Sequence, residues 1–244
     1  MNSFRPKSPP PENVQSRDGA QRISRIMTGV VGTMALVVVV FVGLSRFYGN
    51  KAREIGQSED TTLRQIILGN DVINVPGNVI RFDKQRQAIA LNRLDLYFLW
   101  PGFEGYSRKR DHAFFGPPRT TQDLIFVTLE KRKFALDMSA RMGVVYARLL
   151  EGPQQPSVAG LVFQLLRPEA GYSGEELHYE NHGPHPYVVR CQRFETDKQD
   201  ATCMRDVHVG GNLSLTYRFS RKHLEQWRAI EAALTNIVRG YLAN

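Results

Sequence analysis

The chain has 244 residues and a formal net charge of +8, from 32 Lys and Arg against 24 Asp and Glu. Five of the basic and two of the acidic residues fall in residues 1–25, which leaves 27 basic and 22 acidic residues for the rest of the chain. A nucleic-acid-binding domain usually gathers its basic residues into a stripe with aromatic residues between them. The one comparable cluster, Arg108-Lys109-Arg110, is better explained as a solvated loop, so the composition argues against nucleic acid as a partner.

The first 25 residues are rich in proline, serine and charge and nearly free of apolar side chains. Such a segment buries too little apolar surface to offset the entropy lost on ordering. We therefore expect residues 1–25 to be a disordered basic tail, and we place it in the cytoplasm because of the segment that follows.

Residues 26–44, IMTGVVGTMALVVVVFVGL, form an uninterrupted apolar run of 19 residues with an arginine just outside each end. As a helix the run would be about 28 Å long, close to the ~30 Å hydrocarbon core of a bilayer. It is longer than the apolar part of a secretion signal, and no small-x-small cleavage site follows it. The sequence therefore predicts an uncleaved, single-pass signal anchor with the lipid bilayer around it.

Two features of the sequence indicate on which side of the membrane the domain after the span lies. Five basic residues precede the span within 25 positions and four follow it within 20, an asymmetry that favours a cytoplasmic N-terminus only slightly. The two cysteines, Cys191 and Cys203, have eleven residues between them, a spacing that suits the two arms of a hairpin. A disulfide there would stabilise the fold by ~3 kcal/mol and would persist in an oxidising compartment. The alternative is two unrelated buried thiols, which would also suit a domain that lies in the cytoplasm.

Residues 45–62 are polar and charged and are predicted to be a juxtamembrane linker, while residues 63–244 are long enough for one domain with its own core. The apolar patterns in this domain predict several short strands. These lie at residues 64–68, 72–75, 94–100, 124–129, 160–166, 187–194, 202–209 and 213–219. The turn sequence Gly69-Asn70-Asp71 predicts a hairpin between the first two, and the last three are predicted to form a meander with one buried face. The strict alternation at 94–100 indicates a strand with one buried face.

Two helices are predicted among the strands. One begins at the capping residue Asp137 and is expected to end at Gly152-Pro153, and the other follows Ser220 with apolar residues every three or four positions up to Tyr241. Residues 169–186 show no strand or helix pattern and are expected to form a loop. The predicted fold class is α+β, in which a single N-terminal transmembrane helix precedes a largely antiparallel sheet packed against a C-terminal amphipathic helix.

Three histidines in that expected loop, His178, His182 and His185, suggest a metal site. Imidazoles are good ligands for zinc or copper, and three of them with an open fourth position would be a catalytic arrangement. Gly183 and two prolines nearby prevent one helix from presenting all three side chains, so a solvent-facing loop without any cofactor is the alternative.

A second candidate site is the aromatic loop after residue 99. Rigid aromatic residues beside arginines are typical of protein interfaces and of the headgroup region of bilayers. The alternative is a strand end tucked into the core and followed by an ordinary loop. The residues expected to bind are Trp100, Phe103, Tyr106, Arg108 and Arg110.

Local catalytic motifs are missing from the sequence, including G-x-S-x-G, H-E-x-x-H, the Walker loop and G-x-G-x-x-G. The basic tail, the single span, the segment GNDVINVPGNVIRF and the stretches around Cys191, Cys203 and residues 215–219 resemble uncharacterised single-pass inner-membrane proteins of Gram-negative bacteria. The resemblance implies a periplasmic domain with paired cysteines and brings no known activity or catalytic residue.

The function expected from these observations is non-enzymatic. A membrane-anchored periplasmic protein of this kind would bind or scaffold another envelope protein of unknown identity, including as a neutralising partner for a toxin. The alternative function is a metal-dependent envelope enzyme that uses the histidine loop.

Overall fold

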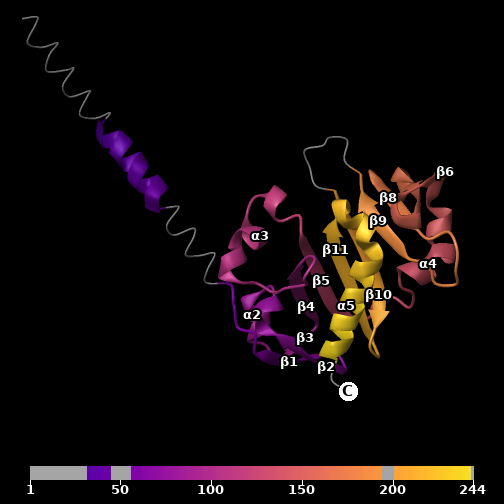
Figure 1. Ribbon diagram of the computed structural model, residues 1–244, viewed down its shortest axis with the longest axis horizontal. Coiled ribbons are helices and arrows are strands. Elements are labelled where there is room, and N and C mark those ends of the chain that lie inside the picture. Colours follow the sequence, from indigo (N-terminus) through magenta and orange to yellow (C-terminus); the bar gives the residue numbers. More distant parts are fainter. Residues whose placement is uncertain (1–31, 45–55, 194–200, 243–244) are drawn as a thin grey trace, which may run out of the picture. The chain divides into compact units, whose positions relative to one another are not determined.

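The computed structural model describes residues 32–44, 56–193 and 201–242. The chain divides into two units, Met1–Ile55 and Gly56–Asn244. In the first unit, residues 32–44 form a helix whose side chains are all exposed (Figure 1). Among the helices of the described ranges, none has the length and hydropathy needed to cross a membrane. The predicted tail, the start of the predicted span at 26–31 and most of the predicted linker lie outside the described residues.

An eight-stranded antiparallel sheet forms the centre of the second unit (Figure 1). Its strands, in spatial order, are β4 (Arg93–Leu99), β5 (Leu124–Lys131), β11 (Leu213–Ser220), β10 (Thr202–Val209), β9 (Val188–Gln192), β8 (Glu175–Tyr179), β7 (Val162–Leu166) and β6 (Leu150–Pro156). The meander predicted for the last three strand-like runs is confirmed as β9, β10 and β11. Because consecutive strands are mostly neighbours, short connections are enough to build most of the sheet.

The predicted disulfide is present. Cys191 of β9 and Cys203 of β10 lie directly opposite each other in the strand pairing, and their sulfur atoms are 2.02 Å apart. Both residues are fully buried. The alternative of two unrelated thiols is therefore wrong.

A smaller sheet consists of β1 (Leu63–Leu68), β2 (Asp71–Pro76) and β3 (Ala90–Leu91), in the order β2-β1-β3. The predicted hairpin between β1 and β2 is confirmed, and β3 runs parallel to β1. Gly69 opens the two-residue turn with a φ of 65°, a conformation that favours glycine at the first central position of a hairpin turn.

The C-terminal helix α5 (Trp227–Tyr241) packs on one face of the large sheet, as predicted. Its apolar stripe, Trp227, Ile230, Leu234 and Val238, joins the main core with inward side chains from β4, β5, β11, β10 and β9 and from the small sheet. Ser220 does not cap this helix, because it is a buried residue at the end of β11 and a 3-10 segment, η7 (Arg221–Gln226), lies between it and α5.

The opposite face of the large sheet has two smaller cores. One lies under α3 (Asp111–Phe115), where the rings of Tyr97 and Phe114 are 5.0 Å apart, and the other lies under α4 (Met138–Val144). The remaining short helices are α2 (Asp83–Arg86) and the 3-10 segments η1 (Gly77–Val79), η2 (Arg108–Arg110), η3 (Pro118–Thr120), η4 (Tyr146–Arg148), η5 (Val158–Gly160) and η6 (Pro168–Ala170).

These cores correct the prediction for β4. The strand is buried on both faces, because α3 covers the side that the alternating pattern assigned to solvent. The segment around α3 has no hydrophobic periodicity, so the sequence pattern did not predict a helix there.

Two further predictions need correction. Asp137 caps α4 as expected, with its Oδ1 accepting a hydrogen bond from the Ala140 N–H at 3.0 Å, but the helix ends at Val144 and Gly152-Pro153 lies inside β6. Gly143 and two β-branched residues disfavour a longer helix. The loop expected over residues 169–186 is also wrong in part, because β8 occupies its middle.

Candidate functional site

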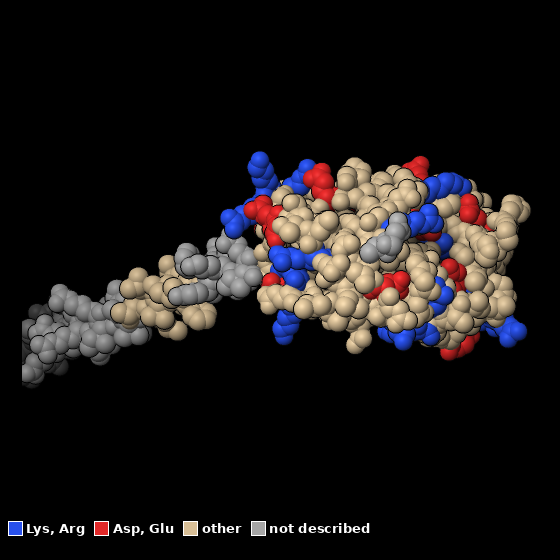
Figure 2. Space-filling view, turned by 90° about the horizontal axis from the view of Figure 1, so that it is seen from below, with Lys and Arg blue, Asp and Glu red and all other residues tan. Residues whose placement is uncertain are grey.

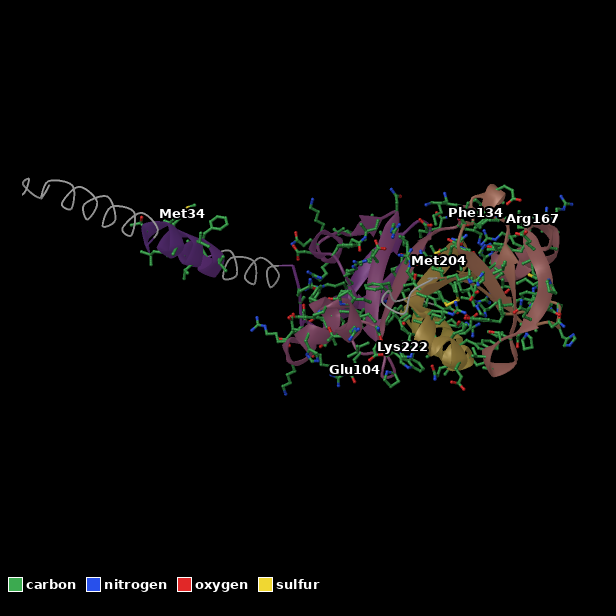
Figure 3. The ribbon with its side chains drawn as sticks, turned by 90° about the horizontal axis from the view of Figure 1, so that it is seen from above. Met34, Glu104, Phe134, Arg167, Met204 and Lys222 are labelled. Carbon is green, nitrogen blue, oxygen red and sulfur yellow. A yellow bond between two sulfur atoms is a disulfide. The ribbon has the colours of Figure 1, made fainter. Side chains whose placement is uncertain are left out.

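The middle of the large sheet presents a polar surface on the side opposite α5. Successive residues of a strand point to opposite faces, so the neighbours of the core residues on β5, β11, β10 and β9 point away from α5. In the strand register, Phe126, Arg218, Met204 and Arg190 lie next to one another across these four strands. We call this surface, between the cores under α3 and α4, the open face; Figure 3 labels Met204 near the middle of the unit.

Two hollows open on this surface. The first has a volume of about 370 Å³ and includes Arg81, Asp95, Phe126, Thr216 and Arg218 in its lining. The second, of about 310 Å³, is lined by Glu175, Arg190, Gln192, Thr202, Met204 and Arg218. Because Arg218 and Thr202 belong to both linings, the two hollows are neighbours on the open face.

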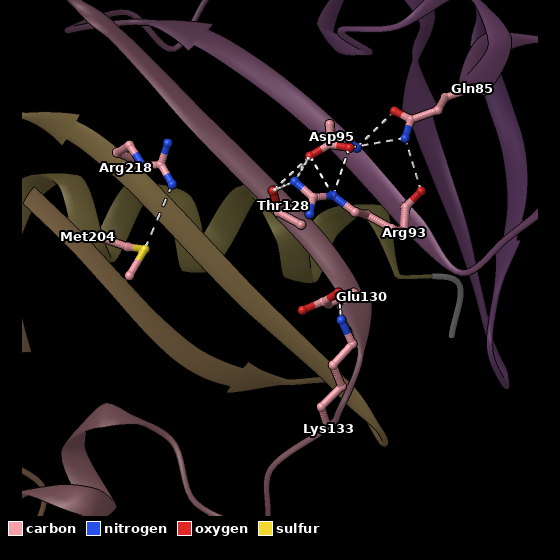
Figure 4. A network of polar contacts seen from close by, with 8 residues as sticks. All are labelled: Gln85, Arg93, Asp95, Thr128, Glu130, Lys133, Met204 and Arg218. Carbon is pink, nitrogen blue, oxygen red and sulfur yellow. Dashed lines mark hydrogen bonds and ion pairs between the residues drawn. The ribbon is translucent and has the colours of Figure 1, made fainter. Parts of the chain in front are cut away.

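Asp95 organises one side of the first hollow (Figure 4). Its carboxylate accepts hydrogen bonds from the Arg93 guanidinium at 2.7 Å, the Thr128 hydroxyl at 2.8 Å and the Gln85 amide at 3.1 Å. Burial raises the pKa of Asp95, but these hydrogen bonds outweigh that effect and hold the pKa below its usual value. The carboxylate is therefore ionised at neutral pH, and its charge is matched by Arg93.

Two other arginines of the first hollow have no such partner. The Arg218 side chain is exposed, and its Nη2 lies 4.0 Å from the Met204 sulfur (Figure 4). The Arg81 guanidinium stacks over the rings of Phe126 and Phe82, with its central carbon 4.7 and 5.0 Å from their centroids. Within the described residues neither guanidinium contacts a carboxylate, so the hollow carries unpaired positive charge.

The aromatic loop does not form one surface. Trp100 and Phe103 are half-buried against the main core, with ring centroids 5.4 Å apart, and Tyr106 is buried under α3. Arg108 and Arg110 are exposed and form ion pairs with Glu59 and Glu104, respectively. The structure thus separates the five residues expected to bind, with the aromatic rings turned inward and the arginines outward.

The three histidines are also separated. His178 is buried on β8, where its Nδ1 is 2.7 Å from the Ser157 hydroxyl and its Nε2 is 2.7 Å from Glu176 Oε1. His182 and His185 are exposed in the loop after β8. The part of the chain that the structure describes contains no group of three or more His, Cys, Asp or Glu side chains placed to hold a metal ion.

Glu176 connects His178 to Arg221, the first residue of the 3-10 segment η7. Burial raises the pKa of Glu176, but the contacts with His178 and Arg221 outweigh it and lower the pKa overall. Because the ionised Glu176 carboxylate can only accept a hydrogen bond, His178 donates to it from Nε2. The other ring nitrogen, Nδ1, lies at hydrogen-bond distance from the Ser157 hydroxyl. The chain of contacts therefore joins β8, the segment before η5 and η7 inside the protein.

A second buried polar group was not anticipated from the sequence. Arg205 of β10 donates to Glu231 of α5 at 3.0 and 3.1 Å, to the Val188 carbonyl at 2.8 Å and to the Ser139 hydroxyl at 3.1 Å. Its position between Cys203 and Val207 on the inward face of a predicted strand was the available signal. Arg205 fastens α5 and α4 to the sheet, and four of its five N–H donors are used within the protein.

Charged residues on the view of the second unit from below are interspersed, with Lys and Arg next to Asp and Glu (Figure 2). Among the described residues drawn on this side, no broad basic stripe is seen.

The fold and the open face define an α+β domain with a large antiparallel sheet, one face of which is only partly covered. No family model matches the chain, and curated proteins give no match. Similar solved structures include an immunity protein of the Stenotrophomonas maltophilia type IV secretion system, with 16% sequence identity and a TM-score of 0.50 over 75% of this chain and 94% of that chain. Another is the iron-regulated outer membrane lipoprotein FrpD of Neisseria meningitidis, with 11% identity and a TM-score of 0.49 over 78% of this chain and 96% of that chain. At this identity, the likeness to the immunity protein shows a shared fold alone.

Proposed function

We propose that the chain is a single-pass, signal-anchored protein of the bacterial inner membrane whose C-terminal domain lies in the periplasm and binds another envelope protein without catalysing a reaction. The apolar run at residues 26–44 supports the anchor. The Cys191–Cys203 disulfide supports an oxidising compartment, since disulfides are rare in the cytosol.

The observation that carries the binding role is the open face. An antiparallel sheet commonly leaves one face to solvent, so the residue types on this face, and not its exposure, are what point to binding. Here the central strands present Phe126, Met204 and Arg218 beside a hollow, and aromatic residues, Met and Arg are the types that protein interfaces favour. We therefore assign the partner contact to the open face.

The particular form of binding that we favour is neutralisation of a toxin. The structure with a similar fold is that of an immunity protein of a secretion system. A fold likeness is only an analogy for function, so it adds to the open face and does not replace it.

Nothing in the geometry favours the metal-dependent alternative. His178 uses both ring nitrogens within the protein, and the other two histidines, His182 and His185, are exposed. The aromatic loop stays a weaker candidate for the partner contact, because its rings pack against the chain's own cores.

Site-specific photo-crosslinking in intact cells tests the proposal. A photoreactive residue is placed in the full chain at Thr216, on the open face, and in a matched variant at Arg167, an exposed residue toward the β6–β8 end (Figure 3). We expect a discrete protein adduct from position 216 and none from position 167. Equal adducts from both positions, or none from position 216, would contradict the assignment.

A further inference from the structure

We propose that the open face recognises its partner through a carboxylate, the side chain of an Asp or Glu or a chain terminus, held between Arg81 and Arg218 in the first hollow. The inference rests on the proposed function and adds the chemistry of the partner. It concerns a different part of the molecule from the aromatic loop.

Both arginines line the first hollow. Arg81 stacks over Phe126, and Phe126 lies directly opposite Arg218 in the pairing of β5 and β11. Arg218 also lines the first hollow, and its Nη2 lies 4.0 Å from the Met204 sulfur on β10. The two arginines therefore reach the hollow from two elements that are far apart in the sequence. Thr216 lies two residues before Arg218 on the same face of β11 and also lines the hollow.

The carboxylate that the protein itself supplies is already engaged. Asp95 is bound by Arg93, Thr128 and Gln85 on the other side of the hollow. Arg190, in the second hollow, is paired with Glu175 at 2.6 Å. The charge left over in the described part of the open face is thus positive and is centred on Arg81 and Arg218.

An arginine pair of this kind selects a carboxylate for geometric reasons. The planar guanidinium presents parallel N–H donors that match the two oxygens of a carboxylate. Phe126, Leu124 and Leu96 supply apolar lining beneath, which lowers the local dielectric and strengthens such a pair relative to one in open water. The same lining can receive an apolar residue beside the acidic one.

Selection of random linear peptides, displayed on phage, against the purified full chain provides the probe. We expect the enriched peptides to share an Asp or Glu, and we expect replacement of that residue by Asn or Gln to weaken binding about tenfold or more, as for a lost charge-assisted hydrogen bond. Arg218→Gln should weaken the same peptide to a similar extent, with little further loss when both changes are combined. Arg167→Gln is the matched control and should change nothing.

Three results would overturn the inference. These are enriched peptides that lack acidic residues, affinity that survives the Arg81→Gln, Arg218→Gln double variant, and competition by inorganic phosphate as strong as that by a free acidic peptide. Because both arginines lie at the surface of the hollow, the variants should keep the wild-type thermal midpoint, which circular dichroism would verify.

The crosslink at position 216 separates this inference from the proposed function. If the adduct forms in the double arginine variant with undiminished yield, the open face binds a partner but not through a carboxylate. If no adduct forms at position 216 in the otherwise wild-type chain, the proposed function itself fails.

Discussion

Individual side chains in this protein owe their roles to partners that are distant in the sequence. The alternating pattern of β4 places Asp95 on the face away from the main core, as the structure shows. Its partners Gln85 and Thr128 come from other elements, which no local pattern could reveal. The same is true of His178, whose Nδ1 lies 2.7 Å from the hydroxyl of Ser157, 21 positions earlier in the chain.

Asp95→Asn should make the domain less stable in a pH-dependent way. Because the folded-state pKa of Asp95 is depressed, its contribution is present above the unfolded pKa of about 3.9 and is lost as the pH falls through the folded value. We expect the variant to lower the free energy of unfolding by about 1–3 kcal/mol at pH 7 and by less at pH 3. Urea titrations of both proteins measure this, with the exposed Glu151→Gln as control. A difference that is the same at both pH values would contradict the assignment.

His178→Ala should destabilise the fold, because it leaves Glu176 buried with one partner fewer. We expect a loss of about 1–3 kcal/mol, whereas His182→Ala, at an exposed position, should change the free energy of unfolding by less than about 0.5 kcal/mol. A chelator should leave the thermal midpoint of the wild-type protein unchanged. A chelator-sensitive midpoint that becomes insensitive in both variants would restore the metal hypothesis.

At the scale of elements, strong periodicity was enough to predict the main parts. The β9–β10–β11 meander, the β1–β2 hairpin and α5 were all found from apolar patterns and turn residues. The wrong predictions concern elements whose type, length or burial depends on tertiary contacts. β8 depends on buried polar pairs, α4 ends early, and α3 covers a face of β4 that looked solvated.

The packing of α5 on the sheet should supply a large share of the stability of the domain. Ile230 and Leu234 are fully buried in the main core. Ile230→Ala should lower the free energy of unfolding by about 2–5 kcal/mol through lost burial and the cavity left behind. Asn236→Ala, on the exposed side of the same helix, should stay within about 0.5 kcal/mol. Equal effects of the two changes in denaturant titrations would show that α5 is not packed as described.

The disulfide between β9 and β10 should contribute independently of the helix. Replacing both Cys191 and Cys203 by Ala should lower the free energy of unfolding by about 3 kcal/mol, since the closed loop is short. Reductant should weaken the wild-type protein by a similar amount and leave the variant unaffected. If wild-type protein that is unfolded and refolded in reductant keeps the same free energy of unfolding as the oxidised protein, the disulfide does not contribute as expected.

At the scale of the whole molecule, the sequence predicted the α+β class but not the surface that we consider functional. The open face arises from the order of eight strands and from the separation of α3 and α4 on one side of them, and both are properties of the complete sheet. Arg81 and Arg218 are 137 positions apart in the numbering, so neither could be paired with the other beforehand. By contrast, the aromatic loop stood out in the sequence because its residues are contiguous.

Thiol labelling of the full chain in intact cells is the most direct test of the periplasmic placement. Both native cysteines are joined in the disulfide, so Val144→Cys, at an exposed position on α4, introduces the one reactive thiol. If the domain is periplasmic, a membrane-impermeant maleimide will label this residue in intact cells while a cytoplasmic marker stays unlabelled. Labelling only after lysis would place the domain in the cytoplasm and would contradict the periplasmic placement and an envelope partner together.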